Sequence, residues 1–203
     1  GGAFLTSLLF GFVFGKPLIN LLRRRQGRGQ PIRSDGPEGH QSKAGTPTMG
    51  GALILGALVV STLLWARLDN MHIWVVLFVT IGFGAIGFAD DYAKVSKQTS
   101  AGVSGRVRLG LGFVIALIAA LVAAQLHPEG LRLQVAVPVL KDTLVPFGIL
   151  FFPFAMIVIV GTANAVNLTD GLDGLAVMPV MIAAAALGVL AYAVGRVDFT
   201  QYL

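Results

Sequence analysis

Six long apolar stretches constrain the fold of this chain more than any other feature. They lie near residues 1–22, 48–66, 72–89, 109–126, 145–163 and 175–194. An apolar helix of about 20 residues crosses the hydrocarbon core of a bilayer, so six of them would use about 120 of the 203 positions and leave short connections. The sequence therefore predicts an all-α fold, a polytopic transmembrane helix bundle with six spans.

The composition excludes several other classes of protein. Only 12% of the residues are charged, whereas about a quarter are charged in a soluble domain, so a water-soluble enzyme is not expected. The chain has no cysteine, which removes disulfides, thiolate metal sites and a cysteine nucleophile. Its basic residues lie beside apolar stretches rather than on a face with interleaved aromatics, so we expect no nucleic-acid partner.

The distribution of lysine and arginine predicts an orientation in the membrane. Ten of the fifteen lie in two connections, 23–49 and 90–108, whereas the opposite connections and the tail hold four. Cytoplasmic loops carry an excess of these residues. The two basic connections are therefore predicted to be cytoplasmic and the N-terminus to be outside. The third connection on the cytoplasmic side, residues 164–174, has no basic residue and carries Asp170 and Asp173.

The connection between the fourth and fifth spans has a different pattern. Apolar residues at 131, 133, 135 and 137 alternate with other residues, which is typical of a strand, and Pro138 then interrupts the ladder. We expect a short extracytoplasmic β-hairpin here, without a chemical role. Elsewhere, Gly11 with Gly15 and Gly84 with Gly87 have a spacing that suits close helix packing in lipid.

Four of the ten acidic residues lie at the predicted cytoplasmic ends of spans, two of them adjacent as Asp90 and Asp91. At a helix C-terminus each acid opposes the macrodipole by about 0.3–1 kcal/mol, and neighbouring acids also repel each other. Either this is a solvated helix end with Lys94 nearby, or a divalent cation or the basic loops neutralise the pair. Mg²⁺ suits such a place, because it binds one or two carboxylates together with substrate phosphate oxygens.

Residues 164–174 hold two asparagines, two acids and two glycines. Asp170 and Asp173 would share a face of a helix, since they are three residues apart. Capping of the next span by Thr169 or Asp170 is the ordinary interpretation, but it explains only one of the acids. The segment is therefore a second candidate for a site.

A third candidate lies at residues 43–51, before the second span. Amides and hydroxyls of its glycines and threonines can bind a phosphate at a helix N-terminus, and Lys43 adds a positive charge. A basic loop with Pro47 at a helix start explains the same residues without a ligand.

Three sequence motifs carry a resemblance to a known family: TPTMGG at 46–51, GFADDY at 87–92 and NAVNLTDGLDGL at 164–175. In order and spacing they resemble the signatures of the polyprenyl-phosphate N-acetylhexosamine 1-phosphate transferases, in the form typical of the phospho-N-acetylmuramoyl-pentapeptide transferases. The resemblance implies a bacterial inner-membrane enzyme of peptidoglycan synthesis. Such an enzyme transfers phospho-MurNAc-pentapeptide from UDP-MurNAc-pentapeptide to undecaprenyl phosphate, giving lipid I and UMP, with Mg²⁺ as cofactor.

The resemblance also implies roles for particular residues. The catalytic carboxylates, which could also bind the metal, would be Asp90 and Asp91. The residues expected to contact the substrates are Lys43, Thr48, Asn167, Asp170 and Asp173. Asp90 could act as a base toward the lipid phosphate or as a covalent nucleophile, and the sequence does not choose between them.

The family fold has ten transmembrane helices, and its later part supplies a further aspartate for Mg²⁺ and a histidine-rich loop. We therefore expect residues 1–203 to be a single partial membrane domain with six of ten spans, inactive alone, with the main metal ligand beyond Leu203. The resemblance leaves a homodimer open. The alternatives are a relative that uses UDP-N-acetylglucosamine, a membrane transporter, and a non-catalytic membrane scaffold.

Overall fold

A computed structural model describes residues 1–26, 47–98, 102–137, 140, 143–170 and 175–195. The chain divides into two compact units, Gly1–Ile157 and Val158–Leu203, each described by itself below. The described helices of the chain are α1 (Gly2–Gln26), α3 (Gly51–Trp65), α4 (Met71–Lys97), α5 (Gly105–Leu126), α6 (Phe151–Thr169) and α7 (Val177–Val194).

These helices confirm the predicted fold class, a multi-pass helical membrane protein. In the described part of the chain, five helices are long and apolar enough to cross a membrane, namely α1, α4, α5, α6 with the turn before it, and α7. The sixth apolar helix, α3, has 15 residues and is therefore about 22 Å long, shorter than the hydrocarbon core of about 30 Å. Pro17 lies inside α1, as membrane helices tolerate.

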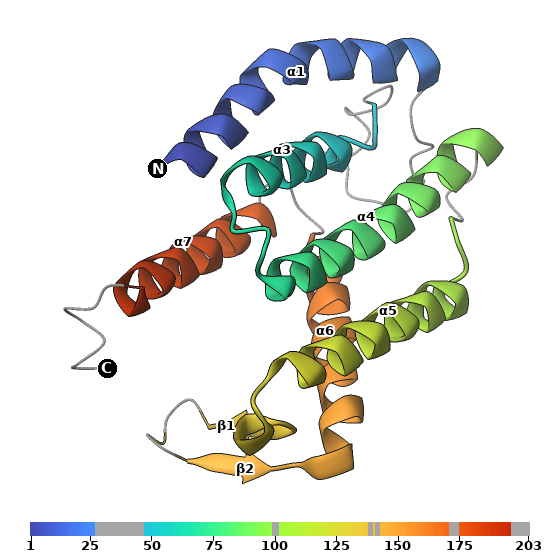
Figure 1. Cartoon of the computed structure of the whole chain (residues 1–203). Helices are drawn as coiled ribbons and strands as arrows, with labels where there is room; N and C mark the ends of the chain where they lie inside the picture. Colours follow the sequence, from blue (N-terminus) through green and yellow to red (C-terminus); the bar gives the residue numbers. More distant parts are fainter. Residues whose placement is uncertain (27–46, 99–101, 138–139, 141–142, 171–174, 196–203) are drawn as a thin grey trace. The chain divides into compact units, whose positions relative to one another are not determined.

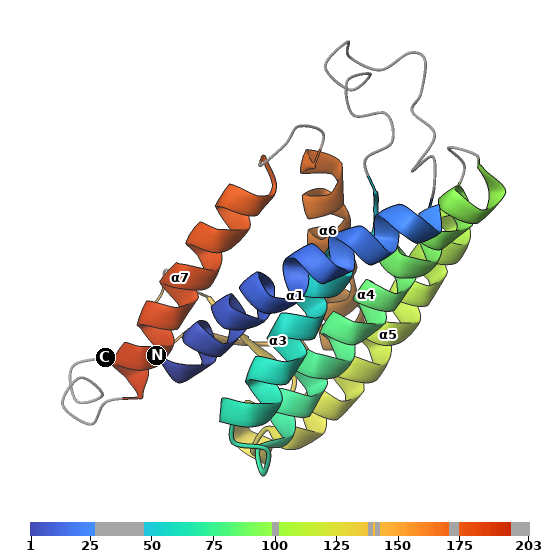
Figure 2. The same ribbon diagram turned by 90° about the horizontal axis from the view of Figure 1, so that it is seen from above.

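In the first unit, four helices form a layer in chain order. Helix α1 packs on α3, α3 on α4, and α4 on α5 (Figures 1 and 2). Successive helices run in opposite directions, so the C-terminal ends of α1 and α4 and the N-terminal ends of α3 and α5 lie at one end of the layer. Four chain segments can therefore bring side chains together at that end.

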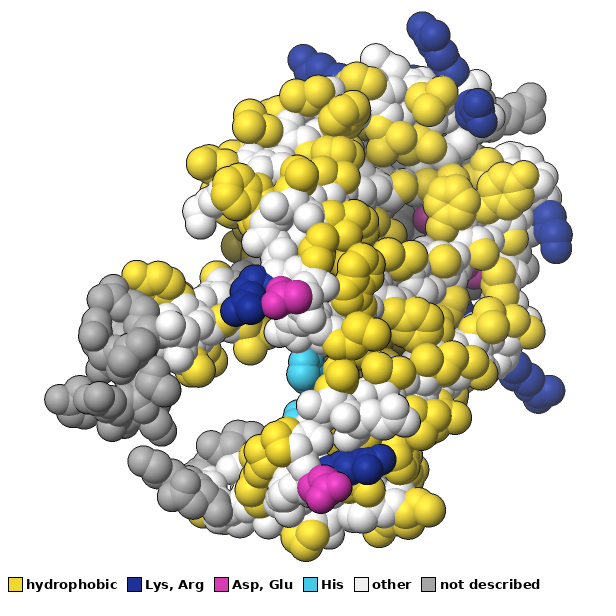
Figure 3. Space-filling view, viewed as in Figure 1, with side chains coloured by type: hydrophobic (Ala, Val, Ile, Leu, Met, Phe, Trp, Pro, Cys, Tyr) yellow, Lys and Arg dark blue, Asp and Glu magenta, His cyan; other side chains and the backbone are white. Residues whose placement is uncertain are grey.

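Most large apolar side chains of these helices face outward. Phe12, Ile54 and Val76 are more than half exposed, and hydrophobic side chains cover most of the face seen in Figure 3. The buried residues of α5 are small: Gly112, Ala116, Ala119, Ala120 and Ala124. Small residues at contacts and large apolar residues outside are typical of helices that pack in lipid.

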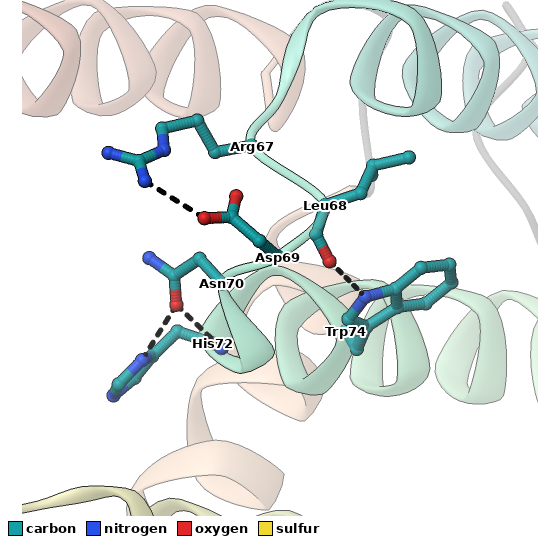
Figure 4. A network of polar contacts seen from close by, with 6 residues as sticks. All are labelled: Arg67, Leu68, Asp69, Asn70, His72 and Trp74. Carbon is teal, nitrogen blue, oxygen red and sulfur yellow. Dashed lines mark hydrogen bonds and ion pairs between the residues drawn. The ribbon is translucent and has the colours of Figure 1, made fainter.

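The turn that joins α3 to α4 lies at the end of these two helices opposite to the C-terminus of α4 (Figure 4). Arg67 and Asp69 form an ion pair at 2.8 Å, and the indole nitrogen of Trp74 donates to the carbonyl of Leu68 at 2.9 Å. Asn70 caps α4 by accepting a hydrogen bond from the backbone amide of His72. Both charged side chains of this turn are exposed, whereas Asp90, toward the opposite end of α4, is buried.

The predicted hairpin between α5 and α6 is confirmed. Strands β1 (Gln134–Ala136) and β2 (Leu144–Pro146) pair antiparallel, with Val135 opposite Val145. The fifth predicted span therefore began too early, because residues 144–146 belong to β2 and α6 begins only at Phe151.

Several other helix boundaries differ from the predicted ends of the spans. Helix α4 continues to Lys97 instead of ending at 89, and α3 begins at Gly51 instead of 48. Helix α6 continues to Thr169, whose hydroxyl donates to the carbonyl of Val166 in the same helix, so Thr169 ends α6 and does not cap α7. The N-cap of α7 is Ala176, which makes no side-chain capping bond.

The prediction of close packing at glycine holds for Gly84. A Cβ atom there would overlap the side chain of Leu55 in α3, whereas Gly11 and Gly87 face no described atom within 4 Å. Gly82, which the spacing argument did not select, meets Ile115 of α5 in the same way. Helix α4 thus approaches both of its neighbours through glycines.

Gly84→Val should lower the stability of the detergent-solubilised full-length protein by about 1–3 kcal/mol, because the new side chain overpacks the contact with Leu55. Thermal unfolding measures this effect. Combining Gly84→Val with Leu55→Ala should destabilise less than the sum of the two single changes, since the second makes room for the first. Additive effects, or a Gly84→Val variant as stable as wild type, would contradict the packing.

Candidate functional site

The adjacent acids lie inside α4 and not at its end. Six residues follow Asp91 before the helix ends at Lys97, so the macrodipole penalty expected from the sequence is largely absent there. The two side chains differ in environment, since the side chain of Asp90 is 9% exposed and that of Asp91 is 31% exposed. The interpretation of a solvated helix end is therefore wrong for Asp90.

The carboxylate of Asp90 is bonded at both oxygens. Its Oδ2 atom lies 2.7 Å from Nζ of Lys94, one turn later in α4, and 3.8 Å from Nη1 of Arg108 in α5. Its Oδ1 atom accepts a hydrogen bond from the backbone amide of Val103 at 2.8 Å. Two cations and an amide thus compensate for the burial of this charge.

Gly102 lets the chain before α5 reach Asp90. A Cβ atom at this position would overlap Oδ1 of Asp90 and crowd Cε of Lys94, so the backbone lies directly against the carboxylate. Ser104 then caps α5 by accepting from the amide of Val107. Arg108 lies in the first turn of α5, where a cation opposes the helix dipole, and Asp90 offsets that effect.

Asp91 joins a second motif to the first. The hydroxyl of Thr48 donates to Oδ2 of Asp91 at 3.0 Å, across 43 residues of sequence. Oδ1 of Asp91 lies 3.8 Å from Nζ of Lys94, which is too far for a hydrogen bond. The structure therefore brings together Thr48, Asp90 and Asp91, three of the residues selected from the sequence.

Thr48 is itself held by Gln26, the last residue of α1. The side-chain amide of Gln26 donates to the Thr48 carbonyl at 3.0 Å and accepts from the Thr48 amide at 2.9 Å. Sequence reasoning missed Gln26, because it follows three arginines at a helix end and belongs to none of the three motifs. It also missed Gly102 as a neighbour of Asp90. The alternative that the basic loops neutralise the acids holds for Asp90, because Arg108 belongs to the basic connection 90–108.

The donor atoms at this end of the layer fit a site for Mg²⁺ and phosphate only in part. Within the described ranges, no group of three or more His, Cys, Asp or Glu side chains could hold a metal. Oδ1 of Asp91 is the one oxygen of the pair to which no described residue donates a hydrogen bond. Mg²⁺ needs only one or two carboxylates when phosphates and water complete its shell, so Asp91 fits such an ion.

The remaining predicted residues lie either in the second unit or outside the described residues. Asn167 lies in the last turns of α6 and Asp170 directly follows that helix; both are exposed residues of the second unit. Asp173 and Lys43 lie outside the described residues. Nearby in α6, the Asn164 side chain donates to the carbonyl of Val160 at 2.8 Å, one turn earlier.

Comparisons with known proteins identify the family of the chain. Residues 73–203 match the family model described as glycosyl transferase family 4, and residues 43–55 match phospho-N-acetylmuramoyl-pentapeptide-transferase signature 1. Proteins named phospho-N-acetylmuramoyl-pentapeptide-transferase from Ruegeria pomeroyi, Dinoroseobacter shibae and Maricaulis maris are 71%, 70% and 59% identical to the chain. Each alignment covers the whole chain and 56%, 56% and 57% of the relative, so the chain spans little more than half their length.

Gly102→Ala should loosen the hold on Asp90, because the added methyl group overlaps the carboxylate and separates it from the Val103 amide. The amide of Val103 should then exchange with solvent about tenfold faster or more, as expected for loss of a hydrogen bond to a charged group. Hydrogen exchange of the full-length protein measures this. Gly105→Ala is the matched control, since a Cβ there meets no described atom within 4 Å; equal exchange in both variants would contradict the geometry.

Proposed function

The chain belongs to glycosyl transferase family 4, and on this premise we propose that the complete protein transfers phospho-MurNAc-pentapeptide from its UDP carrier to undecaprenyl phosphate. The products are lipid I and UMP. A P–O bond forms between an oxygen of the lipid phosphate and the phosphorus that bears the sugar, and the bond from that phosphorus to UMP breaks. The printed names of the relatives and the signature at residues 43–55 support this donor.

The observation that carries the proposal is the hydrogen bond from Thr48 to Asp91. It joins the signature segment before α3 to the acidic pair of α4, and Lys94 and Arg108 lie beside them. One substrate is soluble in water and the other is held in lipid, so their phosphates must meet at the membrane surface. An end of a layer of membrane helices that carries acids, cations and a hydroxyl group is suited to that meeting.

The surroundings of the two acids support different roles for them. Asp90 is buried, and its oxygens are bonded to Lys94 and to the Val103 amide, so nucleophilic attack by Asp90 would first have to break these contacts. This favours direct transfer from donor to lipid phosphate over a covalent intermediate on Asp90. In that mechanism Asp90 holds Lys94 and Arg108 in place, and these cations stabilise the charge that grows as UMP leaves.

Asp91 is the residue proposed to bind Mg²⁺, through the Oδ1 atom that accepts no hydrogen bond from a described residue. The bound ion would neutralise charge on the pyrophosphate. Thr48 keeps Oδ2 engaged and so fixes the direction of Oδ1. A further metal ligand from the rest of the complete protein remains part of the proposal.

Other features stay proposals that rest on the resemblance. Lys43 would contact a phosphate of the donor, and Asn167, Asp170 and Asp173 would lie on the nucleotide side. The protein would lie in the bacterial inner membrane with the acidic pair facing the cytoplasm and the N-terminus outside, as the basic connections indicate. A homodimer belongs to the same set of predictions.

Two alternatives give different results in assays. A relative that uses UDP-N-acetylglucosamine would share the chemistry and differ in the donor. A transporter usually places its charged groups near the middle of the membrane. The acids paired here lie near one end of α4, which favours an enzyme at the membrane surface.

The full-length protein, incubated with undecaprenyl phosphate and Mg²⁺, should release UMP from UDP-MurNAc-pentapeptide and not from UDP-N-acetylglucosamine. Chromatography of the nucleotide products measures both reactions. Release only from UDP-N-acetylglucosamine would show that the protein uses the donor of the other branch of the family. Absence of release from either donor would contradict the proposed function.

Asp91→Asn should lower kcat about a hundredfold or more, because the amide is a poor ligand for Mg²⁺ and charge stabilisation at a transferring phosphate is worth effects of this size. It should also raise the Mg²⁺ concentration needed for half-maximal rate. Asp69→Asn is the matched control, since Asp69 is an acid at the opposite end of α4 whose partner is Arg67. Equal activities of the two variants would contradict the role of Asp91.

A further inference from the structure

Gln26 is buried although the three residues before it are exposed. It is 9% exposed at the end of α1, directly after Arg23, Arg24 and Arg25, which all lie on the surface. A buried side-chain amide is stable only where its donor and acceptor are both satisfied. The donor and the acceptor of the Gln26 side chain both bond to the backbone of Thr48.

Thr48 needs these two bonds because it precedes α3. The helix begins at Gly51, so the amide and carbonyl of Thr48 have no partner within it. Met49, directly after it, has a positive φ of 74°, an uncommon conformation for a residue with a side chain. Such a backbone persists where its surroundings hold it, and the paired bonds from Gln26 lie one residue away.

The fixed backbone of Thr48 determines where its hydroxyl points. That hydroxyl donates to Oδ2 of Asp91, so a continuous chain of hydrogen bonds runs from the end of α1 through Thr48 to α4. We infer that Gln26 is a positioning residue for Asp91: its amide holds Thr48 so that the Thr48 hydroxyl orients the Asp91 carboxylate. The effect of this orientation on catalysis rests on the proposed function of Asp91.

A merely structural link between α1 and α3 is the competing explanation, and the chain offers a matched control for it. At the opposite end of the same two helices, the indole nitrogen of Trp65 donates to the hydroxyl of Thr6 at 2.9 Å. Thr6→Val removes that bond between the same helices, far from the acids. If Gln26 only holds α1 against the segment that leads into α3, removal of the Gln26 bonds and removal of the Thr6 bond should have similar effects on turnover.

The experiment measures kcat and KM for UMP release by the full-length protein carrying Gln26→Met, Thr48→Val, both changes together, or Thr6→Val. Methionine keeps the approximate size of glutamine without its hydrogen bonds. Gln26→Met should lower kcat about tenfold to a hundredfold, as small displacements of catalytic groups do, with KM for the donor within about twofold of wild type. Thr6→Val should leave kcat unchanged.

The double variant gives the sharper result. Because Gln26 acts through Thr48, Gln26→Met combined with Thr48→Val should be no slower than Thr48→Val alone. Multiplied effects, or a wild-type kcat in Gln26→Met, would overturn the inference while leaving the proposed function intact. If Gln26→Met does not fold, Gln26→Glu replaces it, since glutamate keeps the acceptor for the Thr48 amide and loses the donor to the Thr48 carbonyl.

Hydrogen exchange at the Thr48 amide tests the contact with Gln26 without a measurement of enzyme activity. It should be faster in Gln26→Met than in wild type and unchanged in Thr6→Val. Unchanged exchange in Gln26→Met would overturn the inference at its structural step. A wild-type protein that releases no UMP would instead contradict the proposed function, and the catalytic meaning of Gln26 with it.

Discussion

Two adjacent carboxylates in the largely apolar helix α4 are the constraint on which the rest of this end of the molecule depends. Asp90 is buried, and a buried charge is stable only when it is paired and hydrogen-bonded. Lys94, Arg108 and the amide of Val103 meet that requirement for Asp90, and Thr48 meets part of it for Asp91. Besides Lys94 of their own helix, the acids thus contact the segment before α3, the segment before α5 and the first turn of α5.

The antiparallel layer of helices makes it possible for these groups to lie beside the two acids. Helices α4 and α5 supply the acids and cations directly, and the segment before α3 supplies Thr48. Helix α1, which composition alone marks only as a membrane span, contributes Gln26 from its last position. The site therefore lies toward one end of the layer, which is where the proposed function requires a lipid-held phosphate and a soluble nucleotide to meet.

The sequence predicted the membrane class and the hairpin, because hydropathy and strand alternation are local signals. It also selected Thr48, Asp90 and Asp91, which the structure brings together. It misplaced the ends of α3, α4 and α6, since a boundary depends on which side chains satisfy the last backbone groups. Thr48 shows this: its backbone bonds to Gln26 rather than to α3. Gln26 and Gly102 were missed because each acts through a contact between segments, which spacing along one segment does not reveal.

The central claim is that Asp91, oriented by Thr48, offers one carboxylate oxygen to a metal ion while Asp90 stays engaged with Lys94. A structure of the full-length protein with the UDP-linked donor and Mg²⁺ tests it most directly. We expect Mg²⁺ at about 2.1 Å from Oδ1 of Asp91, with the Thr48 hydroxyl still bonded to Oδ2. Mg²⁺ bound to Asp90 in place of Lys94, or away from both acids, would contradict it.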